Sequence, residues 1–439
     1  MRAALVISVL GITGVVLGFI EDSPAQVLFT SVRQRILDNI ARVPRYTCVE
    51  TINRDMHRPW SASRPAKCSD IIAAHSKLNT PRTLTWHDRL RLDVAVGNNS
   101  EMFSWAGASS FETGAMDELA SNGATGSGAF SSFLASIFGN DADQFRYMGE
   151  HDTPFGRLAT FDYAVPQARS HYNTRMGDGQ DHIIGYHGSF YVIPATGTIR
   201  RLEVIADQFP GGEACRVVDT MDYKTVKIGS GEFILPEVST MDVLYSTGDE
   251  ARNETTFSGC REYVGESTIR FDDPDDPNDK ASPAAAARAA LKALPPKTHI
   301  RVKIDPPINS ESAAAGDPIT GVVEHEVKEK GQVIVRTTDR LHGRLLRLEQ
   351  QMVPTPKWTV SIRFDSIERD GVIEPVHFKP TDDGDRTPTP MGYGGRRGSI
   401  SPQQPPVTIK RPDGAGVFTM AVTGNLVLDQ KFHSEWETR

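Results

Sequence analysis

The chain has 439 residues, of which 24% are charged and 38% are hydrophobic, and its formal net charge at pH 7 is -8. This length exceeds the size at which one hydrophobic core normally keeps growing, so we expect two or three domains. The acidic excess is spread along the chain apart from one run, which disfavours nucleic acid as the main partner, because phosphate binding requires clustered Lys and Arg.

Residues 1–25 have the pattern of a secretory signal peptide. Arg2 supplies a short positive region, residues 5–20 are apolar, and Ser23-Pro24-Ala25 places small residues at the cleavage position before Gln26. An uncleaved membrane anchor is the alternative, because the apolar run borders on the roughly 17–25 residues that span a bilayer. We therefore expect an exported protein, periplasmic or extracellular, that is soluble or at most peripheral to the membrane.

Four cysteines in an exported chain predict two disulfides, which allow three connectivities. Cys48 and Cys68 flank a segment rich in Arg, Pro and Ser, whereas Cys215 and Cys260 fall on predicted strands of one later block. We expect Cys48 to pair with Cys68, and Cys215 with Cys260. A zinc site is the alternative, but the spacings of zinc ligands are missing, so neither a metal nor a cofactor is predicted.

Residues 26–271 are predicted to form a mainly β domain. Apolar residues recur at every fourth position in residues 27–42, which predicts an amphipathic helix. A hairpin at residues 186–205, with its turn at residues 194–197, is the clearest β element. Further strands are expected at residues 46–53, 90–96, 102–105, 145–149, 158–165, 217–228, 233–245 and 254–263. So many strands predict a large curved antiparallel sheet, a half-barrel, which short helices must cover.

The β pattern is interrupted between residues 115 and 138. Residues 115–122 and 129–138 are predicted to be helical, and the glycine-rich residues 123–128 between them form a hinge. Core packing is the ordinary explanation of the aromatic set around this hinge. In a half-barrel the same residues would line the cavity and bind a lipid or peptide chain. These candidate ligand-binding residues are Phe103, Trp105, Phe130, Phe133, Leu134, Ile137 and Phe138.

The C-terminal third of the chain has a different organisation. Residues 272–293 are predicted to be a linker, whose acidic start (DDPDDPNDK) lacks the Gly and the distal Glu of a calcium-binding loop. Residues 294–380 contain short alternating strands that suit a small β-barrel domain. Residues 381–406 are dense in Gly, Pro, Asp and Arg, which predicts disorder, and residues 407–439 are expected to dock back as strands.

Motifs for catalysis are weak. Ser189 has His187 nearby but lacks the glycine spacing of a nucleophile elbow. Residues 123–128 (GATGSG) lack the Lys that follows the glycines of a phosphate-binding loop. We therefore predict no catalytic residue.

Three resemblances accompany these predictions. Residues 27–271, with an opening helix, a mobile helical insertion and the P-x-T-G hairpin at residues 194–197, resemble the half-barrel fold of lipoprotein-sorting carriers of the bacterial envelope. The segments YTCVET at residues 46–51 and FSGCREYVGES at residues 257–267 also resemble uncharacterised exported proteins of soil bacteria. Residues 294–348 are similar to small β-barrel modules of conjugation machinery and other exported bacterial proteins.

The carrier resemblance implies a sheet whose apolar face holds an acyl chain or docks a partner, with helices as a lid. The expected function is that of an exported, non-enzymatic envelope protein, which binds a lipid or lipoprotein chain or docks an envelope protein. One alternative is a structural or assembly protein without a ligand cavity. The other is a secreted hydrolase.

Overall fold

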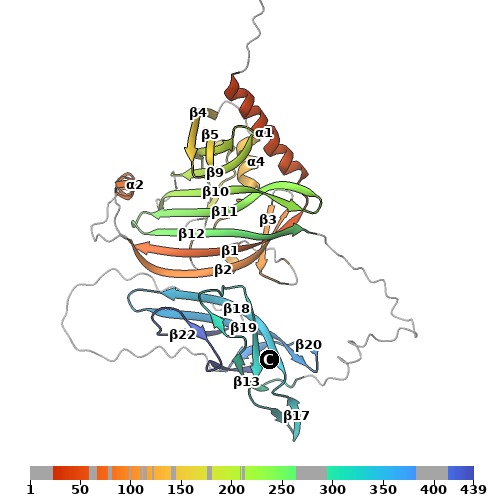
Figure 1. The fold of residues 1–439 in the computed structure, drawn as a ribbon. Helices are drawn as coiled ribbons and strands as arrows, with labels where there is room; N and C mark the ends of the chain where they lie inside the picture. The colour runs from red at the N-terminus through yellow and green to blue at the C-terminus, as the bar shows by residue number, and fades with distance from the viewer. Residues whose placement is uncertain are drawn as a thin grey trace, which may run out of the picture.

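The computed structural model describes residues 23–58, 67–77, 82–97, 100–108, 111, 116–120, 123–139, 145–175, 180–207, 209, 213–263, 294–381 and 414–439. This part of the chain is mainly β, as predicted: an antiparallel sheet of 18 strands dominates it and is not closed into a barrel (Figure 1). The predicted signal peptide, linker and disordered segment fall largely or wholly outside the described residues. Among the described residues, no helix is both long enough and apolar enough to cross a membrane.

The N-terminal strands follow one another across the sheet in the order β4-β5-β8-β9-β10-β11-β12-β1-β2. The predicted hairpin is confirmed, and its turn is held against α1: a Cβ at Gly197, where φ is +64°, would lie 3.3 Å from Ser31 Oγ. The bounds are β1 Tyr46–Arg58, β2 Thr83–Gly97, β3 Ser100–Trp105, β4 Phe145–Thr153, β5 Gly156–Val165, β8 Tyr186–Ile193, β9 Thr198–Ala206, β10 Ala214–Ile228, β11 Gly231–Tyr245 and β12 Glu250–Glu262. Two short strands, β6 Asn173–Arg175 and β7 Asp181–Ile183, pair separately.

Helices α1 (Pro24–Arg42) and α4 (Ser132–Phe138) pack on one face of this sheet, here named the inner face. A capping box of Ser23 and Gln26 starts α1, and its Val32 and Ile36 are buried, as the four-residue spacing predicts. The inner face, α1 and α4 share one apolar core. Its members include Leu134, Ile137, Phe138, Phe161, Tyr163, Tyr186, Phe190, Leu202, Met221 and Tyr223.

The C-terminal strands belong to the same sheet, and β18 pairs with β2. They surround a second core that contains the fully buried Trp436, whose ring lies 5.0 Å from that of Phe364. The tail docks back as predicted, with β22 on β19 and β24 on both β13 and β21. The bounds are β13 His299–Ile304, β15 Pro318–Val323, β18 Arg340–Gln351, β19 Lys357–Arg369, β20 Val372–Pro375, β21 Phe378–Pro380, β22 Gly416–Met420 and β24 His433–Thr438. The short strands β14 (Ile308–Asn309) and β23 (Val427–Leu428) pair with each other, as do β16 (Val327–Glu329) and β17 (Gln332–Val335).

The two blocks of strands meet at the edge of β2. Residues 86–88 of β2 pair with residues 349–351 of β18, and the amide of Arg91 donates to the carbonyl of Ala315 at 2.7 Å. Gly316 is required here, because its φ is +107° and a Cβ would lie 2.0 Å from the carbonyl oxygen of Arg91. Arg344 adds a hydrogen bond to the carbonyl of Ala106. Backbone pairing therefore joins the blocks directly.

The disulfide pairing expected from the sequence is wrong. Cys48 bonds to Cys260, which ties β1 to its neighbour β12, and Cys68 bonds to Cys215, which ties α2 (Cys68–Lys77) to the start of β10. Cys48 and Cys260 face each other because β1 and β12 are antiparallel partners, although 212 residues separate them in sequence. Proximity in sequence was the wrong guide, because strand pairing across the sheet decides which cysteines meet.

We predict that peptide mapping without reduction will link Cys48 to Cys260 and Cys68 to Cys215. Each bridge closes a long loop, of 212 and 147 residues. The variants Cys48→Ala/Cys260→Ala and Cys68→Ala/Cys215→Ala should therefore each lose roughly 2–5 kcal/mol of unfolding free energy in urea. Only the second variant should raise hydrogen exchange selectively in α2. A peptide linking Cys48 to Cys68 would contradict the arrangement.

Candidate functional site

Residues 123–139 cross the inner face and carry α4 at their end; we name them the lid. Phe130, Leu134, Ile137 and Phe138 of the lid are at most 2% exposed. Leu134, Ile137 and Phe138 fill the core below α1, whereas Phe130 packs beside Phe103 in the adjoining core. Phe133 and Trp105 are partly buried against these two cores. The structure thus divides the seven predicted ligand-binding residues between two cores that the lid itself fills.

Aromatic rings make up much of the contact between the lid and the sheet. The ring of Phe138 lies 5.0 Å from that of Phe190 on β8, edge to face. The ring of Phe130 lies 4.9 Å from that of Phe257 and 5.8 Å from that of Tyr46. Such pairs add about 0.5–1.5 kcal/mol each beyond the area that they bury. The lid therefore occupies the place where a half-barrel would hold an apolar guest.

Polar contacts fix the position of the lid. The buried carboxylate of Glu101 on β3 accepts the amide of Gly128 at 2.8 Å and that of Phe130 at 3.4 Å. A carboxylate suits this task because its two oxygens can satisfy two backbone N–H groups. Three other side chains donate to lid carbonyls: Asn253 to Ala124 at 2.9 Å, Tyr223 to Ala129 at 3.2 Å, and Arg33 to Phe138 at 2.8 Å.

A small cavity remains between the lid and strands β10 to β12. Its volume is about 40 Å³. That volume suffices for a water molecule or two and is far below the roughly 300 Å³ at which ligand pockets begin. The lining residues are Ile52, Arg54, Met116, Thr125, Gly126, Ser127, Ala129, Phe133, Asp219, Met221, Ser239, Met241, Asn253 and Thr255.

Ionisable groups lie buried beneath the lid. Burial raises the pKa of Asp219 to about 7, although the hydroxyl of Tyr172, 3.3 Å away, partly opposes the shift. Burial also raises the pKa of Glu50 well above its usual value, and the negative charge of Glu101 adds to this. Arg54 and Asp88 form a buried pair with an Nε to Oδ1 distance of 2.8 Å. The sheet face that the lid covers therefore carries ionisable groups.

The residues considered for hydrolysis do not form a nucleophile and base pair. The hydroxyl of Ser189 donates to the carboxylate of Asp162 at 2.8 Å. His187 Nδ1 instead lies 3.3 Å from the carbonyl oxygen of Ile205. Among the residues that the structure describes, no three His, Cys, Asp or Glu side chains gather as metal ligands would.

Sequence reasoning named the apolar residues of the lid and missed its polar anchors. Glu101, Tyr223 and Asn253 each stand far from the lid in sequence, so no local pattern connects them to it. Glu50 offered a clue, because it stands between Cys48 and Ile52 on the buried face of β1. A carboxylate among the apolar residues on the buried face of a strand is costly to bury, so it indicates a site with a particular role.

Comparisons with known proteins give little guidance. No family model matches the chain, and no curated protein matches it. A solved structure of a DUF1329 family protein from Desulfovibrio piger is similar at 10% sequence identity and a TM-score of 0.25, over 57% of this chain and 98% of that chain. A likeness this distant carries no functional argument, so the interpretation rests on the geometry.

We predict that Asp219 makes the protein less stable as the pH rises from about 4 to about 7. In this window the folded state keeps a proton on Asp219 that the unfolded state releases, so unfolding free energy falls by roughly 2–4 kcal/mol. In Asp219→Asn the side chain stays neutral, and this fall should disappear. Urea unfolding across the pH range measures it. Asp152→Asn, on the exposed side of β4, serves as the control, and an unchanged slope in Asp219→Asn would contradict the assignment.

Proposed function

We propose that the protein is an exported, non-enzymatic binding protein of the cell envelope, in which the inner face of the sheet takes up an apolar chain in place of the lid. The guest would be the acyl chain of a lipid or lipoprotein. The observation that carries the proposal is that four apolar lid side chains, Phe130, Leu134, Ile137 and Phe138, are buried against the sheet. Among the described residues, neither a disulfide nor strand pairing attaches the lid to that sheet.

The lid has little stability of its own. Its helix α4 spans only seven residues, and Ser131 at its start makes no side-chain cap. An isolated helix of this length is unstable in water. Gly123 and Gly128 hold positive φ values of +77° and +100°, which glycine tolerates at no steric cost. The conformation of the lid therefore depends on its contacts with the sheet, and a competing guest can displace it.

The energies of exchange are nearly balanced. Exposing the four buried lid side chains costs on the order of 6–12 kcal/mol, at roughly 1.5–3 kcal/mol each. An acyl chain of about 16 carbons regains about 12 kcal/mol on burial, at roughly 0.8 kcal/mol per methylene. On these figures a guest of that length replaces the lid with no net cost or with a gain of up to roughly 6 kcal/mol, which leaves binding reversible, as a carrier that must release its cargo requires.

Export is supported by the covalent framework. Two disulfides join segments that are 212 and 147 residues apart in sequence, and such bridges persist in oxidising compartments. The apolar N-terminal run and the resemblance to lipoprotein-sorting carriers support the same location.

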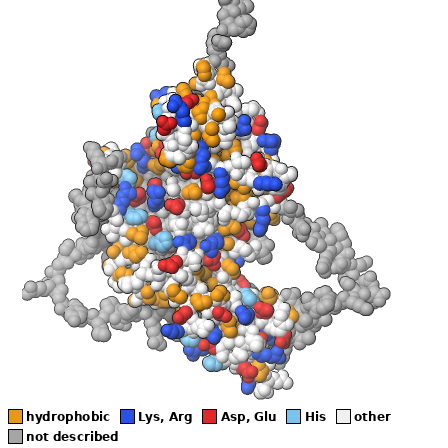
Figure 2. Space-filling view, viewed as in Figure 1, with side chains coloured by type: hydrophobic (Ala, Val, Ile, Leu, Met, Phe, Trp, Pro, Cys, Tyr) orange, Lys and Arg blue, Asp and Glu red, His pale blue; other side chains and the backbone are white. Residues whose placement is uncertain are grey.

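A structural or assembly role is the alternative, and the filled inner face favours it. In that case the lid is a permanent part of the core, and both blocks of strands act as interaction surfaces. On the face shown in Figure 2, basic and acidic side chains are interspersed over the sheet. The two proposals differ in whether the lid yields to an apolar chain.

Truncating the lid should tighten binding of an acyl chain. In Phe138→Leu the closed lid loses packing that the guest-bound state does not use, so the dissociation constant for pyrene-labelled palmitate should fall about tenfold for ~1.4 kcal/mol of lost packing. The matched control is Phe190→Leu, at the ring that Phe138 contacts on β8. Phe190 contacts the lid in one state and the guest in the other, so its truncation should change the affinity little. Fluorescence titration of both variants measures this.

Two results would count against the proposal. Absence of palmitate binding by the wild type and both variants would favour the assembly role. Equal affinities in the wild type and Phe138→Leu would show that the guest binds without displacing the lid.

A further inference from the structure

A second pocket lies on the outer face of β10, β11 and β12, opposite to the lid. Successive side chains of a strand point to opposite faces. On β10, Asp219 and Met221 therefore line the cavity under the lid, while Arg216 and Val218 line the outer pocket. The outer pocket has a volume of about 320 Å³. It is lined by Ile72, His75, Arg82, Arg216, Val218, Asp242, Leu244, Glu250 and Arg252.

Both carboxylates of this pocket are already paired. Glu250 forms an ion pair with Arg82 and lies 3.1 Å from His75 Nε2, and Asp242 lies 3.1 Å from Arg252. Burial lowers the pKa of His75, and the positive charges of Arg82 and Arg216 lower it further, so the imidazole is neutral at pH 7. Three guanidinium groups against two carboxylates leave one positive charge in excess.

Arg216 carries this excess charge. Its Nε is buried, and it has no hydrogen-bond partner among the described residues. A buried donor without an acceptor costs free energy, so its presence calls for an explanation, such as a ligand that supplies the acceptor. A carboxylate can accept two parallel N–H groups from a guanidinium, which gives strong and directional binding.

We propose that the outer pocket binds the carboxylate of a small organic acid with a short apolar chain. The carboxylate pairs with Arg216, and the chain lies against Ile72, Val218 and Leu244. A single negative charge matches the single excess positive charge, whereas an alkyl phosphate carries about 1.5 to 2 negative charges at pH 7. The volume stands at the lower end of the range for ligand sites, roughly 300–1,000 Å³, and so fits a short chain.

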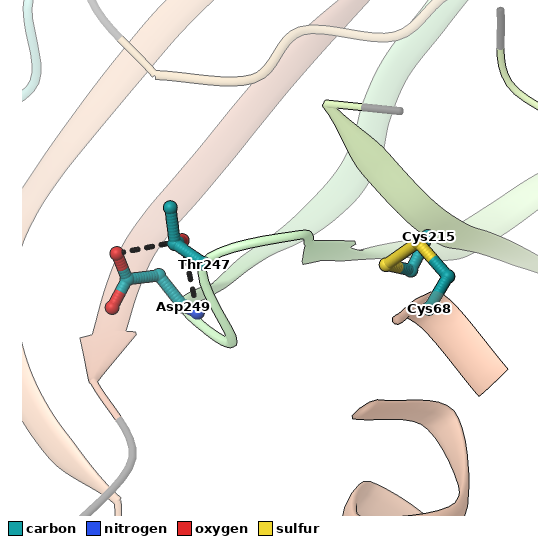
Figure 3. The surroundings of a disulfide bond; sticks show 4 residues. All are labelled: Cys68, Cys215, Thr247 and Asp249. Atoms are coloured by element: carbon teal, nitrogen blue, oxygen red, sulfur yellow. Dashed lines mark hydrogen bonds between the residues drawn. A yellow bond between two sulfur atoms is a disulfide. The ribbon is translucent and has the colours of Figure 1, made fainter. Parts of the chain in front are cut away.

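The disulfide between Cys68 and Cys215 holds one wall of this pocket. The first residue of α2, Cys68, bonds to Cys215 (Figure 3). Ile72 and His75 belong to the same helix, and Arg216 follows Cys215 in the sequence. The turn between β11 and β12, which Figure 3 shows nearby, is fixed by a hydrogen bond of 2.9 Å from Thr247 to Asp249. The disulfide therefore tethers the α2 wall of the pocket to β10. The pocket is separate from the proposed acyl site, so each can fail without the other.

Calorimetric titration of the oxidised full chain with hexanoate tests the proposal, with hexanol and hexyl phosphate as the other probes. We expect saturable binding of hexanoate, and at least tenfold weaker binding of hexanol, which lacks the charge. Arg216→Gln should weaken hexanoate binding at least tenfold. Arg146→Gln, at an exposed arginine of β4, is the matched control and should bind as the wild type does.

Folding of the variants is checked by thermal unfolding. Hexanoate should raise the melting temperature of the wild type and of Arg146→Gln but not that of Arg216→Gln. The Cys68→Ala/Cys215→Ala variant should bind hexanoate more weakly, because its α2 wall is no longer tethered. Equal binding of hexanoate by Arg216→Gln, no binding tighter than millimolar by the wild type, or tighter binding of hexyl phosphate would each overturn the assignment.

Discussion

The need to cover the apolar inner face of the sheet governs the N-terminal part of this structure. Side chains from β5, β8, β9 and β10 gather there, and a patch of that size does not stay exposed on a soluble protein. Two segments supply the cover: α1 before the first strand and the lid between β3 and β4. A cover supplied by a short inserted segment can be exchanged for another apolar body. The constraint that makes the fold stable is therefore also the one on which the proposed binding of an apolar chain depends.

Buried carboxylates beneath such a cover need an explanation, because burial of an ionisable group is unfavourable unless it is paired. Glu101 offsets its cost by accepting two amides of the lid that would otherwise lack partners. Apolar contacts provide most of the energy of lid closure, but they are not directional. The hydrogen bonds to Glu101, Tyr223 and Asn253 determine where the lid sits. When the lid opens, water can form hydrogen bonds with these three side chains, which lowers the free-energy cost of opening.

Local sequence patterns predicted the helix and strand segments well. Features that depend on contacts between distant residues, such as the disulfide pairing, could not be predicted in this way. The spacing of Val32 and Ile36 predicts α1, and the alternation in residues 186–205 predicts the hairpin, since both depend only on neighbouring residues. The disulfides depend on which strands pair, and α2, which begins at Cys68, was not among the predicted elements. The apolar lid residues of the candidate site were found from their helical spacing. Its anchors come from β3, β10 and β12, and only the folded sheet brings them together.

The two proposed sites share strands β10, β11 and β12 and use their opposite faces. They are linked electrostatically, because the negative charge of Asp242 in the outer pocket raises the pKa of Asp219 beneath the lid, in addition to the larger effect of burial. A carboxylate bound beside Arg216 would add negative charge on the side of Asp242 and so favour the neutral form of Asp219. Neutral Asp219 is the form that a closed lid buries at the lower cost. By reciprocity, opening of the lid and ionisation of Asp219 would weaken anion binding on the outer face. If both proposed sites bind their ligands, an occupied outer pocket would therefore favour the closed lid.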